Sequence, residues 1–475
     1  MKLSFFFYDL ETSGLNPKED RVMQFAGQRT DENLKNIGDP FNFLIKFTED
    51  ILPDPQAILV TGITPQQTIK EGLTESAFLA IFHDQIATPG TVFIGYNNIS
   101  FDDEFMRYMN YRNFYDPYEW QWQDQRGRWD LLNVVRMMRA LRPDGIKWPK
   151  DIRGNSVNTL KELAVANQLD HIKAHDALSD VTACIDLARL VQKTQPKLFN
   201  YLFNIRNKRD IAELVTSDEP FVYVGSYQNE FEKTSIYSYL FESISTQEAV
   251  LFDLRYDPLE FINLNAEELA ELWQDTQSIN PLKIIKYNRC PAVAPLNVLD
   301  DVSRVRLKLE PEQLNEHLIQ LKKNLTTWLP TIHRAMELFD KAKRKHYRSI
   351  ASNVDAQLYD KFLDEADRAA LIETRRTPPA ELSIAKFQYT DQRLRRLLPL
   401  YKARNYPEIL TLNEKKRWHN YCQRRLLQGG DKSRYALFVI RMQSLVETNK
   451  LNTKDQKILM ELEAWAHQLI PNNDH

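Results

Sequence analysis

The first 195 residues alternate between short strand-like runs and longer helix-like segments. The runs "SFFFYDLE" (4–11) and "TVFIGYN" (91–97) are apolar and rich in aromatic residues, which is typical of buried strands. Three other segments carry apolar residues at helical spacing: 102–112, 158–169 and 180–194. Alternation of this kind predicts an α/β layer structure.

Two further regions follow along the chain. Residues 221–296 contain several β-like runs, interrupted by the acidic helical segment "NAEELAELW" (265–273), and beyond about residue 310 nearly every segment has a helical pattern. A chain of 475 residues is too long for one ordinary core. We therefore expect three domains: α/β over 1–195, β-rich over 196–349 and all-helical over 350–475.

Overall composition excludes little about the partners of the chain. Its formal net charge is −3, although the 62 Lys and Arg residues can still gather in one groove. The three cysteines are widely scattered, which suits a reducing compartment, so we expect a cytoplasmic protein. The apolar run at the N-terminus stops at Tyr8, and no window reaches the length of a membrane span. We expect no membrane association and a monomer.

Two acids, Asp9 and Glu11, stand inside the first strand-like run. Side chains alternate along a strand, so both point to the same face. Burying two like charges side by side costs several kcal/mol in total, about 2 kcal/mol or more for each carboxylate, unless a cation or a hydrogen-bond donor compensates. Taken alone, the pattern favours a simpler explanation, in which Glu11 ends the strand at an exposed turn.

Two more acids lie on helix faces that should be buried. Asp102 shares its face with Phe105 and Met109, and Asp180 falls on the apolar stripe of its own helix. By the same test Asp103 lies on the wetter side of its helix, and Asp186 is a surface acid. Asp102 and Asp180 thus lack an ordinary structural explanation.

Four inward-facing carboxylates make an oxygen-only ligand set. Such a set suits Mg²⁺ or Mn²⁺, whereas zinc more often recruits His and Cys. Acids that hold two metals about 4 Å apart serve phosphoryl transfer. His175 lies five residues before Asp180. An isolated loop histidine is usually a surface residue, but one beside metal carboxylates is a candidate general base.

The order Asp9-x-Glu11, Asp102, His175-x4-Asp180 resembles the DEDDh 3′→5′ exonucleases, and "TGITPQQ" (61–67) stands where they carry a G-I-T segment. Within that superfamily the chain resembles the bacterial exodeoxyribonuclease I family. The segments that carry this resemblance include "YNNISFDDEF", "RWDLLNVVR", "AHDALSDV", "YNRCPAVA" and "NVDAQLYDKF". It covers most of the chain and is weaker in 219–270 and near the C-terminus.

The resemblance implies an RNase H-like exonuclease domain, then an SH3-like domain and a helical C-terminal domain. It implies processive 3′→5′ hydrolysis of single-stranded DNA to nucleoside 5′-monophosphates, in DNA repair and recombination. Two Mg²⁺ ions, replaceable by Mn²⁺, would be held by Asp9, Glu11, Asp102 and Asp180. His175 would deprotonate the attacking water, and Asp9 would be shared between the metals.

An aromatic-rich stretch between Tyr108 and Trp129 is the expected grip on single-stranded DNA. Aromatic faces stack unpaired bases and arginines meet phosphates. We expect at least half of these aromatic residues to pack in a core and Tyr118 and Trp122 to be the exposed ones. The expected DNA contacts are Arg107, Tyr118, Trp122, Arg136, Arg142, Tyr201 and Lys208.

The resemblance also implies a protein partner, single-stranded-DNA-binding protein, whose acidic and hydrophobic C-terminal tail would dock on the C-terminal region. The segment "RLRRLLPLYKARN" (393–405) has the basic and apolar character that such a tail requires. An ordinary amphipathic helix explains that segment equally well.

Two alternative functions remain open at this point. The first is a DEDDh exoribonuclease or a polymerase proofreading subunit, which the aromatic stretch and the two extra domains disfavour. The second is a catalytically silent nucleic-acid clamp. A pure binder has no need of buried carboxylates that repel phosphate, so the intact acids weigh against it.

Overall fold

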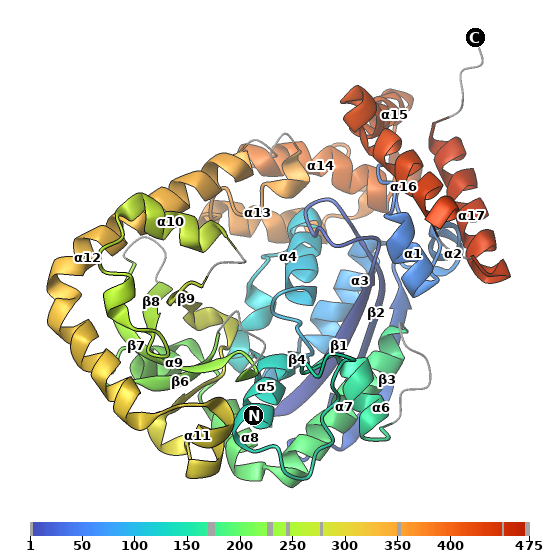
Figure 1. Ribbon diagram of the computed structural model, residues 1–475. Coiled ribbons are helices and arrows are strands. Elements are labelled where there is room, and N and C mark those ends of the chain that lie inside the picture. Colours follow the sequence, from blue (N-terminus) through green and yellow to red (C-terminus); the bar gives the residue numbers. More distant parts are fainter. Residues whose placement is uncertain are drawn as a thin grey trace.

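Two five-stranded sheets and a C-terminal set of helices make up the computed structural model (Figure 1). The structure describes residues 3–169, 176–225, 231–243, 248–275, 279–348, 353–448 and 451–470. Among these residues, no helix has the length and apolar character needed to cross a membrane. The expected order of an α/β part, a β-rich part and a helical part is confirmed.

The first sheet has the strand order β3-β2-β1-β4-β5. Its strands are β1 (Ser4–Thr12), β2 (Val22–Thr30), β3 (Asn36–Leu44), β4 (Thr91–Gly95) and β5 (Gly127–Asp130). β1 is central, antiparallel to β2 and parallel to β4, and β5 is parallel to β4. The carboxyl ends of β1, β4 and β5 therefore meet at one edge, where ligands of such sheets usually bind.

Strand β1 faces a different core on each side. Phe6, Tyr8 and Leu10 pack with residues of α3 and α4, whereas Phe5 and Phe7 pack with residues of α5 and α7. Asp9 and Glu11 continue the face of Phe5 and Phe7, toward α7. The helices of this part are α1 (Pro55–Thr61), α2 (Pro65–Glu71), α3 (Glu75–Ile81), α4 (Asp102–Arg112), α5 (Leu131–Leu141), α6 (Leu160–Ala166), α7 (Ala177–Thr194) and α8 (Pro196–Asn204), whereas α9 (Lys208–Val215) packs with the second sheet.

The second sheet is entirely antiparallel, in the order β10-β6-β7-β8-β9. Its elements are β6 (Phe221–Val224), β7 (Thr234–Glu242), β8 (Glu248–Asp253), α10 (Ala266–Gln274), β9 (Leu282–Lys286), β10 (Val293–Pro295) and α11 (Asp301–Leu307). α10 is the predicted helical insert. The long helix α12 (Pro311–Arg348) packs against it and arches around this part of the molecule (Figure 1).

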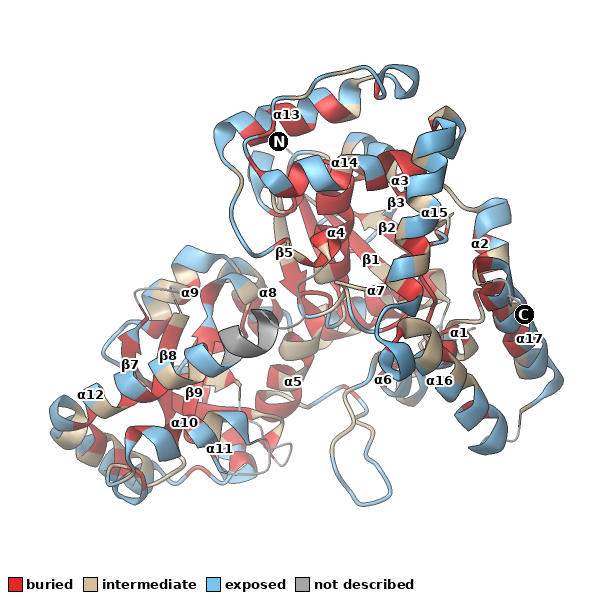
Figure 2. Cartoon of the chain, turned by 90° about the horizontal axis from the view of Figure 1, so that it is seen from above, coloured by how far each residue is buried: buried red, intermediate tan, exposed pale blue. Residues whose placement is uncertain are grey.

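The C-terminal helices pack on the first sheet region through two cores. The helices are α13 (Glu365–Arg376), α14 (Gln392–Asn405), α15 (Leu412–Leu427), α16 (Arg434–Thr448) and α17 (Thr453–Leu469). Phe114 contacts the residues of α14, and Trp465 packs with Phe47 and Ile58. Figure 2 shows buried residues running through β1, β2 and α4, with exposed faces on α15 and α16. The helical part therefore shares its cores with the sheet.

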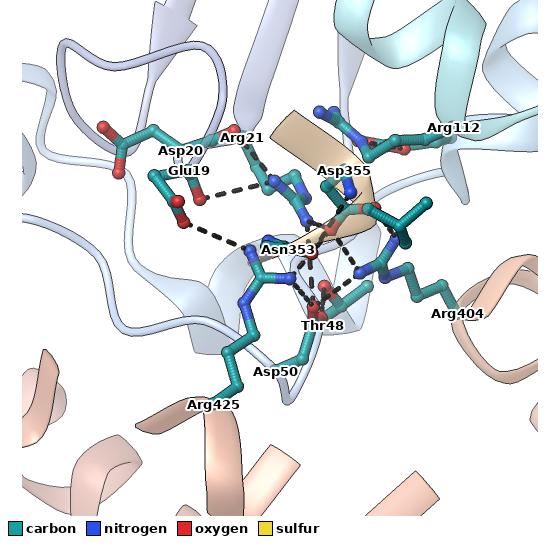
Figure 3. Close-up of polar contacts among 12 residues, drawn as sticks. Glu19, Asp20, Arg21, Thr48, Asp50, Arg112, Asn353, Asp355, Arg404 and Arg425 are labelled. Carbon is teal, nitrogen blue, oxygen red and sulfur yellow. Dashed lines mark hydrogen bonds and ion pairs between the residues drawn. The ribbon is translucent and has the colours of Figure 1, made fainter. Parts of the chain in front are cut away.

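A buried ionic network, formed by Arg21, Asp50, Asp355, Arg404 and Arg425, joins these parts (Figure 3). Both carboxylates are fully buried. The Arg404 guanidinium lies 2.6 Å from Asp355 and 2.8 Å from Asp50, and Arg425 reaches Asp355 at 2.8 Å. Because Asp50 follows β3 and Asp355 precedes α13, the network ties distant segments together.

Candidate active site

Three of the predicted acids meet at the carboxyl end of β1. Asp9, Glu11 and Asp180 each offer a carboxylate oxygen, and these oxygens lie within 4.8 Å of one another. Asp9 and Glu11 come from β1, and Asp180 comes from the first turn of α7, which packs on that strand. Glu11 is buried and the other two are half-buried. Glu11 therefore does not end the strand at an exposed turn.

Asp102 lies beside this group without being one of its three members. It is the first residue of α4, it is buried, and its Oδ1 accepts a 3.2 Å hydrogen bond from the backbone N–H of Leu10. After burial, the charge of Asp102 contributes most to raising the pKa of Asp9. The carboxylate is thus an immediate electrostatic neighbour of the group of three.

Burial and mutual repulsion raise the pKa of Asp9 and Glu11. Burial raises the pKa of Asp9, and the charges of Asp102, Glu11 and Asp180 raise it further. Burial, followed by the charges of Asp180 and Asp176, raises the pKa of Glu11 to about 8. Among the described residues, no ion pair joins Asp9 or Glu11 to a Lys or Arg side chain. Such a group is stable in its charged form only with an added cation.

The predicted general base, His175, lies outside the described residues, so its place relative to the acids stays a prediction. The next residue, Asp176, is described at the start of α7 and accepts a 3.3 Å hydrogen bond from Gln24. Its charge acts on Glu11, which makes it a fifth acid of this edge. In the sequence, only its position next to His175 indicated that Asp176 belongs near the acids.

The prediction for Asp103 is wrong. This carboxylate is completely buried rather than on the wetter side of α4. It accepts hydrogen bonds from the Tyr8 hydroxyl and from Arg128. The helix pattern could not show this, because Arg128 comes from β5 and covers the outward side of α4.

The residues present fit a hard divalent cation. All the donors are carboxylate oxygens, those of Asp9, Glu11 and Asp180 converge within 4.8 Å, and burial together with neighbouring acids raises the pKa of Asp9 and Glu11. Mg²⁺ and Mn²⁺ prefer such oxygen ligands. The acid group, defined as Asp9, Glu11, Asp102 and Asp180, is therefore a candidate metal centre.

A cleft lined by cationic and aromatic side chains lies at the junction of the three parts. The first sheet region contributes Arg107, Tyr118, Gln121, Trp122, Arg126, Gly127 and Arg128, and the connection to the second sheet contributes Arg206, Asn207 and Lys208. The second sheet region contributes Glu248, Lys286, Tyr287, Asn288, Arg289 and Cys290, and the C-terminal part Tyr359 and Phe362. Seven of these side chains are Arg or Lys and only one is acidic, so the cleft suits a single strand of nucleic acid.

Four of the seven predicted DNA contacts line this cleft. Trp122 is 58% exposed and Tyr118 is half-buried, whereas Tyr111, Phe114 and Trp120 are buried. Lys208 also lines the cleft. Arg107 does too, but its guanidinium is buried and already pairs with Glu104 at 2.7 Å.

The other three predicted contacts lie elsewhere. Arg142 and Tyr201 line a separate cavity with Lys197, and Arg142 forms a 3.2 Å ion pair with Asp300. Arg136, on α5, is half-buried and donates to Asn133. The structure does not bring these three to the cleft.

Two cleft residues, Tyr359 and Phe362, were missed. Both rings lie tilted against Tyr118, with ring centroids 6.5 and 6.2 Å away. Arg393 holds their segment by donating to the backbone oxygens of Gln357 and Leu358. Their distance along the chain from Tyr118 gave no local signal, although they belong to the segment "NVDAQLYDKF".

The helix expected to dock an acidic tail is mostly committed inside the molecule. On α14, Arg393 pairs with Asp391, Lys402 with Glu414, and Arg404 with the buried ionic network. Leu394, Leu397 and Tyr401 pack in the core. Only Arg395 and Arg396 remain exposed among its cationic residues. The ordinary amphipathic helix is therefore the better description of 393–405.

Three family models match the chain in succession. They are Exonuclease over residues 6–188, Exonuclease I SH3-like domain over 206–340 and Exonuclease I C-terminal domain over 352–469. The exodeoxyribonuclease I of Escherichia coli (strain K12) is 36% identical over 482 residues, which cover 98% of this chain and 98% of that protein.

Solved structures match over the whole length as well. The exonuclease I of Methylocaldum szegediense has a TM-score of 0.90 at 39% identity, covering 98% of this chain and all of the other. E. coli exonuclease I with a dA16 oligonucleotide has a TM-score of 0.90 at 35% identity, and a zinc-bound complex of it with single-stranded DNA 0.90 at 34%. An SSB/exonuclease I structure has a TM-score of 0.88 at 34% identity. The last three cover 99% of this chain and all of the other.

Proposed function

This chain belongs to the exodeoxyribonuclease I family, and we propose that it removes nucleoside 5′-monophosphates processively from the 3′ end of single-stranded DNA. The observation that carries the proposal is the acid group at the end of β1, together with a cationic and aromatic cleft whose lining residue Arg128 pairs with Asp103, the neighbour of Asp102. The full-length match to exodeoxyribonuclease I disfavours the exoribonuclease and proofreading alternatives.

We assign metal binding to Asp9, Glu11, Asp102 and Asp180, with two Mg²⁺ ions or Mn²⁺ in their place. When bound, the ions neutralise charge on the scissile phosphate and lower the pKa of the attacking water. Asp9 has all three other acids as electrostatic neighbours, which supports its role as the shared ligand. His175 would take the proton of the water.

The cleft would hold the rest of the strand. Trp122 and Tyr118 offer ring faces to unpaired bases, at about 1–3 kcal/mol per stacked base, and Lys208 offers a charge to phosphate. The Arg107 guanidinium lies over the ring of Tyr118, with its central carbon 5.6 Å from the ring centroid, and would hold that ring in place. Arg136, Arg142 and Tyr201 stay proposals for contacts beyond the cleft.

The proposed domain limits are 1–195, 196–349 and 350–475. We propose a monomer, because the described residues of one chain supply both the acid group and the cleft. A cytoplasmic location is supported by the three free cysteines and by the DNA substrate.

Single-stranded-DNA-binding protein is the proposed protein partner, since an exonuclease I structure contains it. We propose that its acidic tail binds this chain at a surface other than α14. A fluorescent acidic peptide with an apolar C-terminus should bind the full chain in an anisotropy titration, and Arg395→Ala should leave its affinity unchanged.

The function is tested with 3′-labelled DNA, single- or double-stranded, and with RNA of the same sequence. We expect labelled mononucleotide from single-stranded DNA alone, and only with Mg²⁺ or Mn²⁺ present. A 5′-labelled strand should shorten progressively, which reports the direction. Tight binding of single strands without release of mononucleotide in Mg²⁺ would contradict the proposal and support a silent clamp.

A further inference from the structure

A short segment of the second sheet region, Tyr287–Cys290, grips the loop that carries Asp102. Arg289 donates from Nη1 to the backbone oxygen of Ile99 at 2.6 Å and from Nη2 to Glu104 at 3.0 Å. These two acceptors flank Asp102 in the sequence. Charge-assisted bonds of this length are among the stronger ones in proteins, so the loop is firmly held.

The same segment reaches α4 by a second route. Arg128 donates from Nη2 to the backbone oxygen of Asn288 at 2.7 Å, and its Nη1 pairs with Asp103. The Cys290 thiol in turn donates to the backbone oxygen of Arg128 at 3.4 Å. Arg128 thus connects the second sheet region to the residue that follows Asp102.

Asp103 completes the connection to the first strand. Its buried carboxylate accepts a hydrogen bond from the hydroxyl of Tyr8, the residue before Asp9, and a 3.5 Å bond from Asn98. Its own backbone N–H donates to the Asn98 oxygen at 2.9 Å. One carboxylate therefore fixes the start of α4 relative to the strand that carries Asp9 and Glu11.

Resting on the proposed function, we propose that the Tyr287–Cys290 segment positions the Asp102 carboxylate for metal binding. It does so directly through Arg289 and indirectly through Arg128 and Asp103. Asn288, Arg289 and Arg128 also line the cleft, so the wall that faces the DNA strand holds a metal ligand in place. Seating of the strand and the geometry of the metal centre are coupled through this wall.

Two simpler roles for Arg289, a contact to DNA alone or a connection between two domains alone, predict different results. A residue that only contacts DNA has no need to bind the oxygen of Ile99. One that only joins two domains would affect stability without affecting the folded enzyme. A positioning role instead predicts altered metal affinity and turnover, because a displacement of about 1 Å in a reacting group costs about 100-fold in rate.

The test compares Arg289→Ala with Arg289→Lys and with the control Arg334→Ala. Arg334 is an exposed arginine of α12 whose partner is Glu337, and it lines no part of the cleft. Each variant is assayed on a long single strand and on the p-nitrophenyl ester of thymidine 5′-monophosphate, which is too small to occupy the cleft. Mn²⁺ affinity is measured by calorimetry on the DNA-free protein, and folding by thermal unfolding.

We expect Arg289→Ala to lower kcat about 10- to 100-fold on both substrates and to weaken Mn²⁺ binding at least threefold. Arg289→Lys should restore part of each loss, and Arg334→Ala should match the wild type. An unchanged Mn²⁺ affinity, with the loss confined to KM for the long strand or to the unfolding temperature, overturns the proposal. Wild-type protein inactive on both substrates would refute the proposed function, whereas the Mn²⁺ titrations would still decide positioning.

Discussion

The acid group and the buried ionic network both bring carboxylates together inside the fold, yet the pKa values of Asp9 and Glu11 move in the opposite direction to those of Asp50 and Asp355. Burial raises the pKa of Asp9 and Glu11, and neighbouring acids raise it further. Burial also favours a raised pKa for Asp50 and Asp355, but the surrounding guanidiniums outweigh it and hold both pKa values below their usual range.

The difference lies in the charged partners of these acids. Asp355 has Arg21, Arg404 and Arg425 within 3.0 Å, so its charge is balanced inside the fold. Among the described residues, only other acids shift the pKa of Asp9 through their charge, so its own charge is left to be balanced by a bound cation. A buried acid with its own arginines is structural, and one among acids indicates a bound cation.

The largest difference between the two clusters is expected when the charge of Asp9 is removed, because this change should affect turnover and not stability. We expect Asp9→Asn to reduce turnover of single-stranded DNA at least about 1,000-fold, because metal ligation supplies several kcal/mol of transition-state stabilisation. Its thermal stability in chelator should equal or exceed that of the wild type, and strand binding should persist. The matched control is Asp186→Asn on α7, which should keep its activity. Equal loss of binding and turnover would make Asp9 structural.

The corresponding change in the buried ionic network should act on stability. Asp355→Ala leaves three buried guanidiniums without their main acceptor, and breaking a buried pair in this way costs about 3–5 kcal/mol. Urea unfolding monitored by tryptophan fluorescence measures the loss. A loss below about 1 kcal/mol would show that water or Asp50 compensates.

Stability without metal should fall as pH rises from about 5 to 8. Glu11 has a pKa of about 8 in the folded chain against 4.5 ordinarily, so the folded state binds the extra proton in this window. Asp50 and Asp355 have lowered pKa values and lose their contribution only at acid pH. Unfolding temperatures in chelator at pH 5.5 and 8.5 measure the slope, which Glu11→Gln should flatten. Excess Mn²⁺ should raise the unfolding temperature more at pH 8.5 than at pH 5.5, because it binds the deprotonated acids. A slope unchanged by Glu11→Gln would exclude this acid as its source.

The smallest effect is expected at an exposed ion pair that spans the same two parts as the network. Arg441 of α16 pairs with Asp54, and the Arg441 side chain is 59% exposed. Arg441→Ala should cost less than about 1 kcal/mol in the same urea experiment, because solvent screens the pair. A cost as large as that of Asp355→Ala would mean that the contact itself, not burial, determines the energy.

Local periodicity sufficed for the parts of the site that lie within single elements. The alternation in "SFFFYDLE" placed Asp9 and Glu11 on one face, and helical spacing placed Asp102 on a buried face and Asp180, which is half-buried, beside them. The exposed Trp122 and the buried Trp120 also follow the prediction. These features depend on neighbours within one turn or one strand.

Contacts between segments far apart in the chain could not be predicted from the sequence. Asp103 was misplaced because Arg128 comes from another strand, and Tyr359 reaches Tyr118 from the far C-terminal part. Arg404 lies on the basic helix α14, which was expected to dock an acidic tail, but its guanidinium already forms ion pairs with Asp50 and Asp355. Helical spacing gives the direction of a side chain and leaves its partner undetermined.

The packing of Trp465 against Phe47 and Ile58 has a consequence for synthesis of the chain. The ribosome releases the sheet and its acid group long before it releases α17. Until the last helix emerges, the apolar surface around Phe47 lacks Trp465, and until α14 and α15 emerge Asp50 lacks Arg404 and Arg425. The nuclease part therefore reaches its final packing only after translation of the chain is nearly complete, and we expect a prematurely terminated chain to expose this apolar face and to aggregate.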